Sequence, residues 1–217
     1  MIKNMRTSET GLVKKVSLQN ANAPRGRGLL KAVAGLFAGL AVLSPFHPAS
    51  AHAAETGEPK VLIVYFSHSG NTRAIANQIH DRVGGDILEL KTTHAYPDEY
   101  RATTEQAKRE LNEGFRPELA NDIESVASYD VVFIGYPTWW GTMPTALFTF
   151  LEKHDLSGKR IVPFCTHGGS GFGRGREDIA KLCPKSEMLE GLAVRGSRAS
   201  DAREDVGEWL REIGMIK

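Results

Sequence analysis

Residues 60–72 read KVLIVYFSHSGNT, an unbroken apolar run followed at once by small and hydroxyl-bearing residues. The run at 61–66 is too short for an average helix, and its β-branched and aromatic side chains suit a strand buried on both faces of a parallel sheet. Apolar residues at four-residue spacing then predict a helix over 71–83. A helix N-terminus directs free N–H groups and a positive dipole end into the preceding turn, which favours an anion there. The candidate residues for this anion site are Ser67, Ser69, Gly70, Asn71 and Thr72.

Strand and helix patterns alternate along the rest of the chain. Further strands are expected at 86–90, 130–136, 159–166 and 192–194, and further helices at 96–114, 146–154, 174–182 and after a cap at Ser200. Tyr100, Thr104, Ala107 and Leu111 are expected to share one face of the second helix. Residues 116–128 form a polar connection with room for a short helical turn. The alternation predicts an α/β fold with a five-stranded parallel sheet, right-handed crossovers and helices on both faces.

The N-terminal 53 residues differ in composition from the rest. They carry seven basic residues against one acid, an apolar run at 32–43 and small residues near 49–53, which is the layout of a signal peptide that is cleaved on export. An uncleaved anchor and a disordered tail are the alternatives, but the run falls short of the roughly 20 apolar residues that span a bilayer. We therefore expect a periplasmic or secreted protein without a stable membrane anchor, in which residues 54–59 lead flexibly into a domain at 60–217.

Charge and cysteine usage narrow the partners further. Without the N-terminal segment the chain carries more acidic than basic residues and no run rich in Lys or Arg, so nucleic acid is not an expected partner. Cys165 is expected at the end of a strand and Cys183 at the far end of the next helix, roughly 15 Å away at the rise of a helix. A disulfide cannot span that distance, so both are predicted to be buried thiols.

Three loops rich in Gly, Ser and Thr follow three of the predicted strands, at 67–72, 137–143 and 166–173. The carboxyl ends of parallel strands lie on one edge of a sheet, and open α/β sheets bind ligands there. Taken singly, the first loop is also compatible with a simple capped turn, and Trp139 and Trp140 with core or interface packing. A turn bounded by Pro137 and Pro144 at this edge is nevertheless poorly placed for a core, and a flat indole there suits stacking on an aromatic ligand.

Several competing site types lack their sequence signature. No Lys follows Gly70 as a triphosphate-binding loop requires, and the first turn has no G-x-G-x-x-G dinucleotide fingerprint. The G-x-S-x-G elbow of hydrolases fails at Phe172, and the Arg of a phosphatase loop starting at Cys165 is replaced by Gly171. No set of His, Cys, Asp and Glu shows structural-metal spacing, so no metal site is predicted.

Four segments together resemble the flavodoxin family, in particular bacterial flavodoxin-like proteins with a Trp-Trp loop. They are VYFSHSGNT at 64–72, YPDEY at 96–100, YDVVFIGYPTWWGTMP at 129–144 and GKRIVPFCTHGGSGFG at 158–173. The resemblance extends from Lys60 to the C-terminus. It implies a flavodoxin-like three-layer sandwich with strand order 2-1-3-4-5 that binds one FMN without a covalent bond.

The resemblance also implies the role of each loop. The residues of the first loop would hold the FMN phosphate with hydroxyls and N–H dipoles, without a cation, and one of the two tryptophans would stack on the isoalloxazine ring. Residues against the ring would be Pro137, Thr138, Trp139, Trp140 and Gly141. Residues at its pyrimidine side would be Thr166, His167, Gly168 and Gly169.

These inferences combine into an expected function. The leading hypothesis is an exported FMN protein that transfers electrons to a redox partner protein or a small-molecule acceptor, with nearby acids lowering the flavin potential. An alternative is an FMN-dependent NAD(P)H:quinone or small-acceptor reductase, for which Arg174 and Arg176 are either anion contacts or simply a solvated helix start. A third hypothesis is a flavodoxin-like interaction module without FMN.

Overall fold

The computed structural model describes residues 57–217, so the predicted signal segment lies outside the described residues. Its elements follow the expected alternation. In chain order they are β1 (Val61–Tyr65), α1 (Asn71–Val83), β2 (Asp86–Glu89), α2 (Tyr100–Glu113), β3 (Val131–Pro137), α3 (Thr145–Lys153), β4 (Arg160–His167), α4 (Gly175–Leu182), β5 (Glu187–Met188), β6 (Leu192–Arg195), the 3₁₀ helix η1 (Gly196–Asp201) and α5 (Arg203–Glu212).

The sheet is parallel and has the order β2-β1-β3-β4-β5, as the resemblance implied. The expected fifth strand is split, because β5 pairs with the start of β4 at Arg160 and Ile161 whereas β6 pairs with its end at Phe164–His167. The short β5 was not predicted from sequence, since two residues carry too little pattern to be recognised. The division brings the end of β6 level with the carboxyl end of β4.

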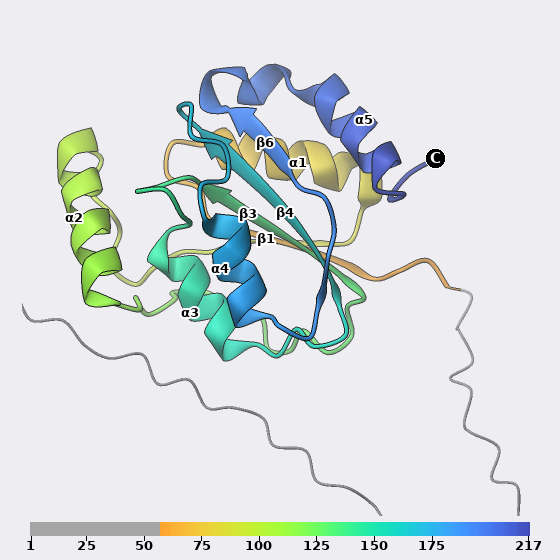
Figure 1. Ribbon diagram of the computed structural model, residues 1–217, viewed down its shortest axis with the longest axis horizontal. Coiled ribbons are helices and arrows are strands. Elements are labelled where there is room, and N and C mark those ends of the chain that lie inside the picture. Colours follow the sequence, from red (N-terminus) through yellow and green to blue (C-terminus); the bar gives the residue numbers. More distant parts are fainter. Residues whose placement is uncertain (1–56) are drawn as a thin grey trace, which may run out of the picture. The chain divides into compact units, whose positions relative to one another are not determined.

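Two apolar cores lie on the two faces of the sheet. Alternate residues of β1 serve both, with Leu62 and Val64 on one face and Val61 and Ile63 on the other. Figure 1 shows α1 and α5 covering one face and α3 and α4 covering the other, with α2 at the side of α3. The central strands are therefore buried on both faces, as their continuous apolar runs predicted.

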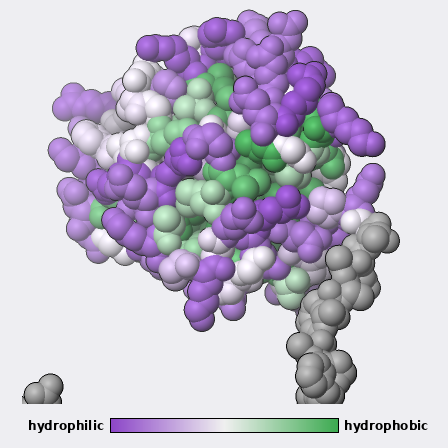
Figure 2. Space-filling view, turned by 45° about the vertical axis from the view of Figure 1, so that its right-hand side comes forward, coloured by the Kyte–Doolittle hydropathy of each residue, from purple (hydrophilic) through white to green (hydrophobic). Residues whose placement is uncertain are grey.

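The surface shown in Figure 2 is mostly hydrophilic, and hydrophobic residues show between the hydrophilic ones at its centre. In the described part of the chain, no helix is long and apolar enough to cross a bilayer. Cys165 and Cys183 are both buried and unpaired, which confirms the prediction of two thiols.

The predicted shared face of α2 coincides only in part with the side on which the helix is buried. The helix buries Thr103, Ala107 and Glu110, whereas Tyr100 is 82% exposed. Burial of the polar Glu110 is possible because its carboxylate accepts hydrogen bonds from Tyr96 Oη at 2.5 Å, Thr145 Oγ1 at 2.8 Å and Gln106 Nε2 at 2.8 Å. An apolar pattern cannot reveal a face that is buried through hydrogen bonds.

Two smaller expectations also fail. Ser200 does not cap the last helix, because it lies inside η1, and α5 begins only at Arg203. The connection at 116–128 contains no helical turn, and its only bridge pairs Leu119 with Thr92. Both segments lie at junctions where tertiary packing decides the local conformation.

Candidate flavin site

A cavity of about 450 Å³ opens at the carboxyl edge of the sheet, where the loops after β1, β3, β4 and β6 meet. Its volume lies in the range of roughly 300–1,000 Å³ that is usual for small-molecule sites. The predicted site residues that line it are Ser69, Asn71, Pro137, Thr138, Trp139, Thr166, His167 and Gly168. The other predicted residues, which do not line it, are Ser67, Gly70, Thr72, Trp140, Gly141 and Gly169.

The loop after β1 turns into α1 through Gly70, whose φ of 90° is a left-handed conformation that glycine adopts without strain. The Ser67 hydroxyl accepts a hydrogen bond from the backbone N–H of Arg73 at 3.3 Å. No side chain of the described residues caps α1 at Gly70. Ser67 thus takes the N–H of Arg73, whereas the N–H groups of Asn71 and Thr72 at the start of the helix are left for an anion beside Ser69 and Asn71.

Thr72 ties the first loop to the third rather than lining the cavity. Its side chain is 1% exposed, and its Oγ1 lies 2.9 Å from Thr166 Oγ1 at the end of β4. A buried hydroxyl pair of this kind holds the two loops at a fixed separation.

The two tryptophans point in different directions. Trp139 lines the cavity and packs edge to face on Tyr96 and Phe66, at centroid distances of 5.2 and 5.5 Å. Trp140 is 49% exposed, and its Nε1 donates a hydrogen bond to the Thr104 carbonyl of α2 at 2.8 Å. Of the two, Trp139 is therefore the one placed to stack on a ring in this cavity.

Backbone hydrogen bonds join the loop after β3 to the loop after β4. Thr138 N donates to the Thr166 carbonyl at 2.8 Å, and Arg174 N donates to the Gly141 carbonyl at 2.8 Å. A Cβ on Gly173 would lie 2.2 Å from the Gly141 oxygen, so only glycine permits this approach. Among the glycines of residues 166–173, Gly173 thus serves the contact between the two loops.

Sequence reasoning missed four residues that line the cavity, namely Tyr100, Arg195, Gly196 and Ser197. The last three lie at the end of β6 and the start of η1, and the only available signal was that the fifth strand must end on the same edge as the others. A Cβ on Gly196 would lie 2.7 Å from Asn71 Nδ2, so glycine lets this strand end approach the first loop. The cavity consequently has a wall that adjoins the N-terminus of α1.

The family model for flavodoxin matches residues 60–213 of this chain. The chain belongs to the flavodoxin family. Among solved structures, it resembles a protein of Bacteroides eggerthii assigned as a flavoprotein, with 33% identity and a TM-score of 0.63 over 71% of this chain and 98% of that one. It shares the fold of a Lactobacillus acidophilus flavoprotein solved in complex with FMN, with 23% identity and a TM-score of 0.53 over 66% and 97% of the two chains.

A curated relative is the NAD(P)H dehydrogenase (quinone) of Chromohalobacter salexigens, which is 28% identical over 98 residues. The match covers 43% of this flavodoxin-family chain and 46% of the relative, so it spans about half the length of that protein.

The lining of the candidate flavin cavity at the carboxyl edge is cationic rather than acidic. Arg195 and His167 are the ionisable side chains that bear nitrogen, and no carboxylate occurs among the described residues that line the cavity. Arg195 Nη1 donates to the Gly168 carbonyl at 3.2 Å. Burial lowers the pKa of His167, and the neighbouring Arg195 lowers it further, so the imidazole is neutral at pH 7. The expected acids near the flavin are therefore not part of this lining.

Arg174 and Arg176 do not line the flavodoxin cavity. Arg174 Nε lies 3.2 Å from Asp178, and Arg176 forms an ion pair of 2.7 Å with Glu190. These ion pairs favour the interpretation that the two arginines belong to a solvated helix start over the interpretation that they are free to contact an anion. The arginine that does line the cavity is Arg195.

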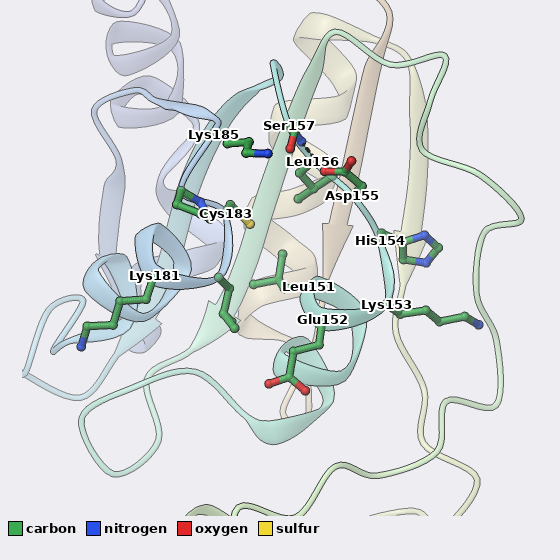
Figure 3. Close-up of a pocket in the computed structure, with 12 residues that line it drawn as sticks. Leu151, Glu152, Lys153, His154, Asp155, Leu156, Ser157, Lys181, Cys183 and Lys185 are labelled. Carbon is green, nitrogen blue, oxygen red and sulfur yellow. Dashed lines mark hydrogen bonds between the residues drawn. The ribbon is translucent and has the colours of Figure 1, made fainter.

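A second cavity, of about 510 Å³, lies at the opposite edge of the sheet, between the ends of α3 and α4 (Figure 3). Two of its polar lining residues are already paired with a residue outside the lining, since Lys153 Nζ and His154 Nε2 both contact Asp122, at 2.5 and 2.9 Å. In Figure 3, Lys153 and Lys181 point outward from the cavity. None of the three predicted loops lines it, so the cavity at the carboxyl edge is the candidate flavin site.

Proposed function

We propose that this protein is an FMN-binding electron-transfer protein that acts outside the cytoplasm. The observation that carries the proposal is the single cavity in which four strand ends combine a helix N-terminus, an aromatic wall and a cation. Membership of the flavodoxin family and the FMN held by the Lactobacillus acidophilus relative support the choice of FMN.

The residues present fit a flavin mononucleotide. Ser69 and Asn71, with the free N–H groups of α1, supply the donors that a phosphate monoester accepts, and Arg195 supplies a positive charge in the same cavity. Trp139 offers a flat apolar surface to the ring system. When bound, FMN supplies the one- and two-electron chemistry, and the protein supplies binding, orientation and electrostatics.

The neutral His167 is a further element of this fit. Its Nδ1 is buried without a hydrogen-bond partner among the described residues, although a buried polar atom usually has one. His167 lines the cavity beside Gly168, where the family resemblance puts the pyrimidine side of the ring. A donor or acceptor of the flavin at this position would satisfy the atom.

Action outside the cytoplasm rests on the composition of residues 1–53. Their basic start, apolar run and small residues support cleavage on export, with periplasmic or secreted protein as the product. Fractionation of the native cells and N-terminal sequencing of the mature chain test this part, and full-length protein in the cytoplasm contradicts it.

Absorption spectroscopy tests the FMN assignment directly. The domain from residue 54 onward, purified and titrated with FMN, is expected to become yellow and to bind FMN more tightly than riboflavin because of the phosphate contacts. A protein that shows no flavin absorption after gel filtration refutes the proposal and leaves the interaction module as the explanation.

A second candidate is an FMN-dependent NAD(P)H:quinone reductase. The Chromohalobacter salexigens relative supports it, as does Arg195, a cation in the cavity that suits an anionic nucleotide or a negatively charged reduced flavin. Rapid NAD(P)H oxidation by the FMN-loaded protein with a quinone favours the reductase. Reduction only through a partner protein favours the carrier.

A further inference from the structure

A smaller cleft of about 260 Å³ adjoins the flavin cavity on the side of α2. Tyr100, Thr138 and Trp139 line both spaces, so the two are contiguous. The remaining lining residues are Thr104, Ala107 and Trp140. Trp139 thus stands as a shared wall between the flavin cavity and the cleft.

The wall of the cleft on α2 is the helix face that the sequence pattern singled out. Tyr100, Thr104 and Ala107 recur at helical spacing and line the cleft together, and this face changes from a buried Ala107 to an open end at Tyr100. Tyr100, at the first turn, is 82% exposed and belongs to no core cluster. An aromatic ring held in water beside two tryptophans is a surface that lacks a partner in the free protein.

Trp140 forms the opposite wall in a strained conformation. Its φ of 50° makes it the one non-glycine residue of positive φ within residues 57–217, and a bulky side chain is rarely found there. Its indole is held by the hydrogen bond to the Thr104 carbonyl and by Lys108 Nζ, which lies 4.8 Å from the ring centroid. Strain that is retained beside a ligand site is more often functional than accidental.

The lining defines the chemistry of the occupant. Three of its six residues are aromatic and none is a carboxylate, Lys, Arg or His, so a charged group would gain no counter-ion from the lining of the cleft. The Thr104 and Thr138 hydroxyls already donate to the carbonyls of Arg101 and Gly171, at 2.9 and 2.7 Å. Recognition therefore rests on stacking and shape, and a volume below roughly 300 Å³ admits one or two fused rings but no dinucleotide.

We propose that this cleft binds a neutral planar acceptor of one or two fused rings, of the quinone class, beside the flavin. The inference develops the reductase candidate and rests on the proposed binding of FMN. With FMN bound, the net reaction would convert a reduced nicotinamide nucleotide, one proton and the quinone into the oxidised nucleotide and the hydroquinone, a transfer of two electrons and two protons that relies on the redox chemistry FMN would supply. The residues of the cleft would hold and orient the quinone beside FMN.

Equilibrium dialysis of 2-methyl-1,4-naphthoquinone against the oxidised, FMN-loaded protein tests the site without turnover. Thr104→Phe fills the cleft and is expected to weaken quinone binding at least tenfold while FMN affinity stays unchanged, because Thr104 does not line the flavin cavity. Tyr100→Ala removes one exposed ring and is expected to weaken quinone binding roughly two- to tenfold. The KM for the quinone should rise in parallel.

Phe115→Ala is the matched control, because Phe115 is also an exposed aromatic residue next to α2 but lines neither space. It should leave quinone affinity unchanged. Equal quinone affinity in all four proteins, with FMN bound in each, overturns the inference and leaves the FMN function intact. Failure of the unsubstituted protein to retain FMN overturns the proposed function instead. Since Tyr100 makes almost no buried contact, its variant remains informative if Thr104→Phe does not fold.

Discussion

Gly173→Ala is expected to separate the two loops that enclose the flavin cavity. Gly173 has a φ of 55°, and an added Cβ would lie 2.2 Å from the carbonyl oxygen of Gly141. That oxygen accepts the backbone hydrogen bond of Arg174 at 2.8 Å, so relief of the clash must break or lengthen this bond. Gly171 provides a matched control, because its φ of 59° is similar but nothing lies within 4 Å of an added Cβ.

The two substitutions should therefore differ in magnitude. A left-handed backbone costs a residue with a Cβ about 1–2 kcal/mol, and this cost applies to both variants. Gly173→Ala additionally loses a hydrogen bond worth about 0.5–1.5 kcal/mol and displaces the loop. We expect the free energy of unfolding to fall by about 1–2 kcal/mol for Gly171→Ala and by at least about 2–3 kcal/mol for Gly173→Ala.

Thermal unfolding followed by circular dichroism measures the difference. At about 2–4 °C per kcal/mol for a domain of this size, the midpoint of Gly173→Ala should lie several degrees below that of Gly171→Ala. FMN titration should show weaker binding for Gly173→Ala, since its clash moves the turn that carries Trp139. Equal midpoints and equal FMN affinities in the two variants would refute the reasoning that the contact of the added Cβ with Gly141, and not the positive φ, causes the larger loss of stability in Gly173→Ala.

Three further outcomes are expected. Thr72→Ala removes the hydroxyl pair between Thr72 and Thr166 that holds the first loop, and it should weaken FMN binding about fivefold, as expected for the loss of one hydrogen bond of about 1 kcal/mol. Riboflavin binding should weaken less. An equal loss of affinity for both ligands in fluorescence titrations contradicts the phosphate assignment. Arg195→Gln should reduce FMN affinity about tenfold and flatten its salt dependence, whereas Arg198→Gln should change neither, because Arg198 pairs with Asp205. Burial raises the pKa of Glu89, but hydrogen bonds from its basic neighbours outweigh burial and lower this pKa from 4.5 to about 2. The ionised Glu89 therefore contributes fully to the free energy of unfolding above pH 4.5, and this contribution is lost as the pH falls toward 2. Denaturant midpoints between pH 5 and pH 2 should therefore fall more steeply for the native chain than for Glu89→Gln.

The central architecture could be read from the sequence because local and tertiary signals agree there. The runs 61–66, 130–136 and 159–166 are apolar enough to require burial on both faces, and each is followed by a loop of small residues. The order of the strands came from the family resemblance, since alternation of strands and helices alone is compatible with more than one doubly wound order.

Parts of the site depended on tertiary contacts that no local pattern encodes. Arg195 lines the cavity only because β5 and β6 divide the edge position of the sheet. The different directions of Trp139 and Trp140 follow from a turn with positive φ at Trp140 and Gly141, which the adjacent tryptophans did not reveal. The burial of Glu110 required the hydroxyls of Tyr96 and Thr145, which come from elsewhere in the chain.

The buried thiols of Cys165 and Cys183 bear on how this domain matures. Burial raises the pKa of both to about 11, so neither is a thiolate at neutral pH, and oxidants and thiol-exchange enzymes react with thiolates. The folded domain therefore has the same covalent structure in a reducing and in an oxidising compartment. Folding of the domain therefore requires neither a disulfide nor a disulfide isomerase in either kind of compartment.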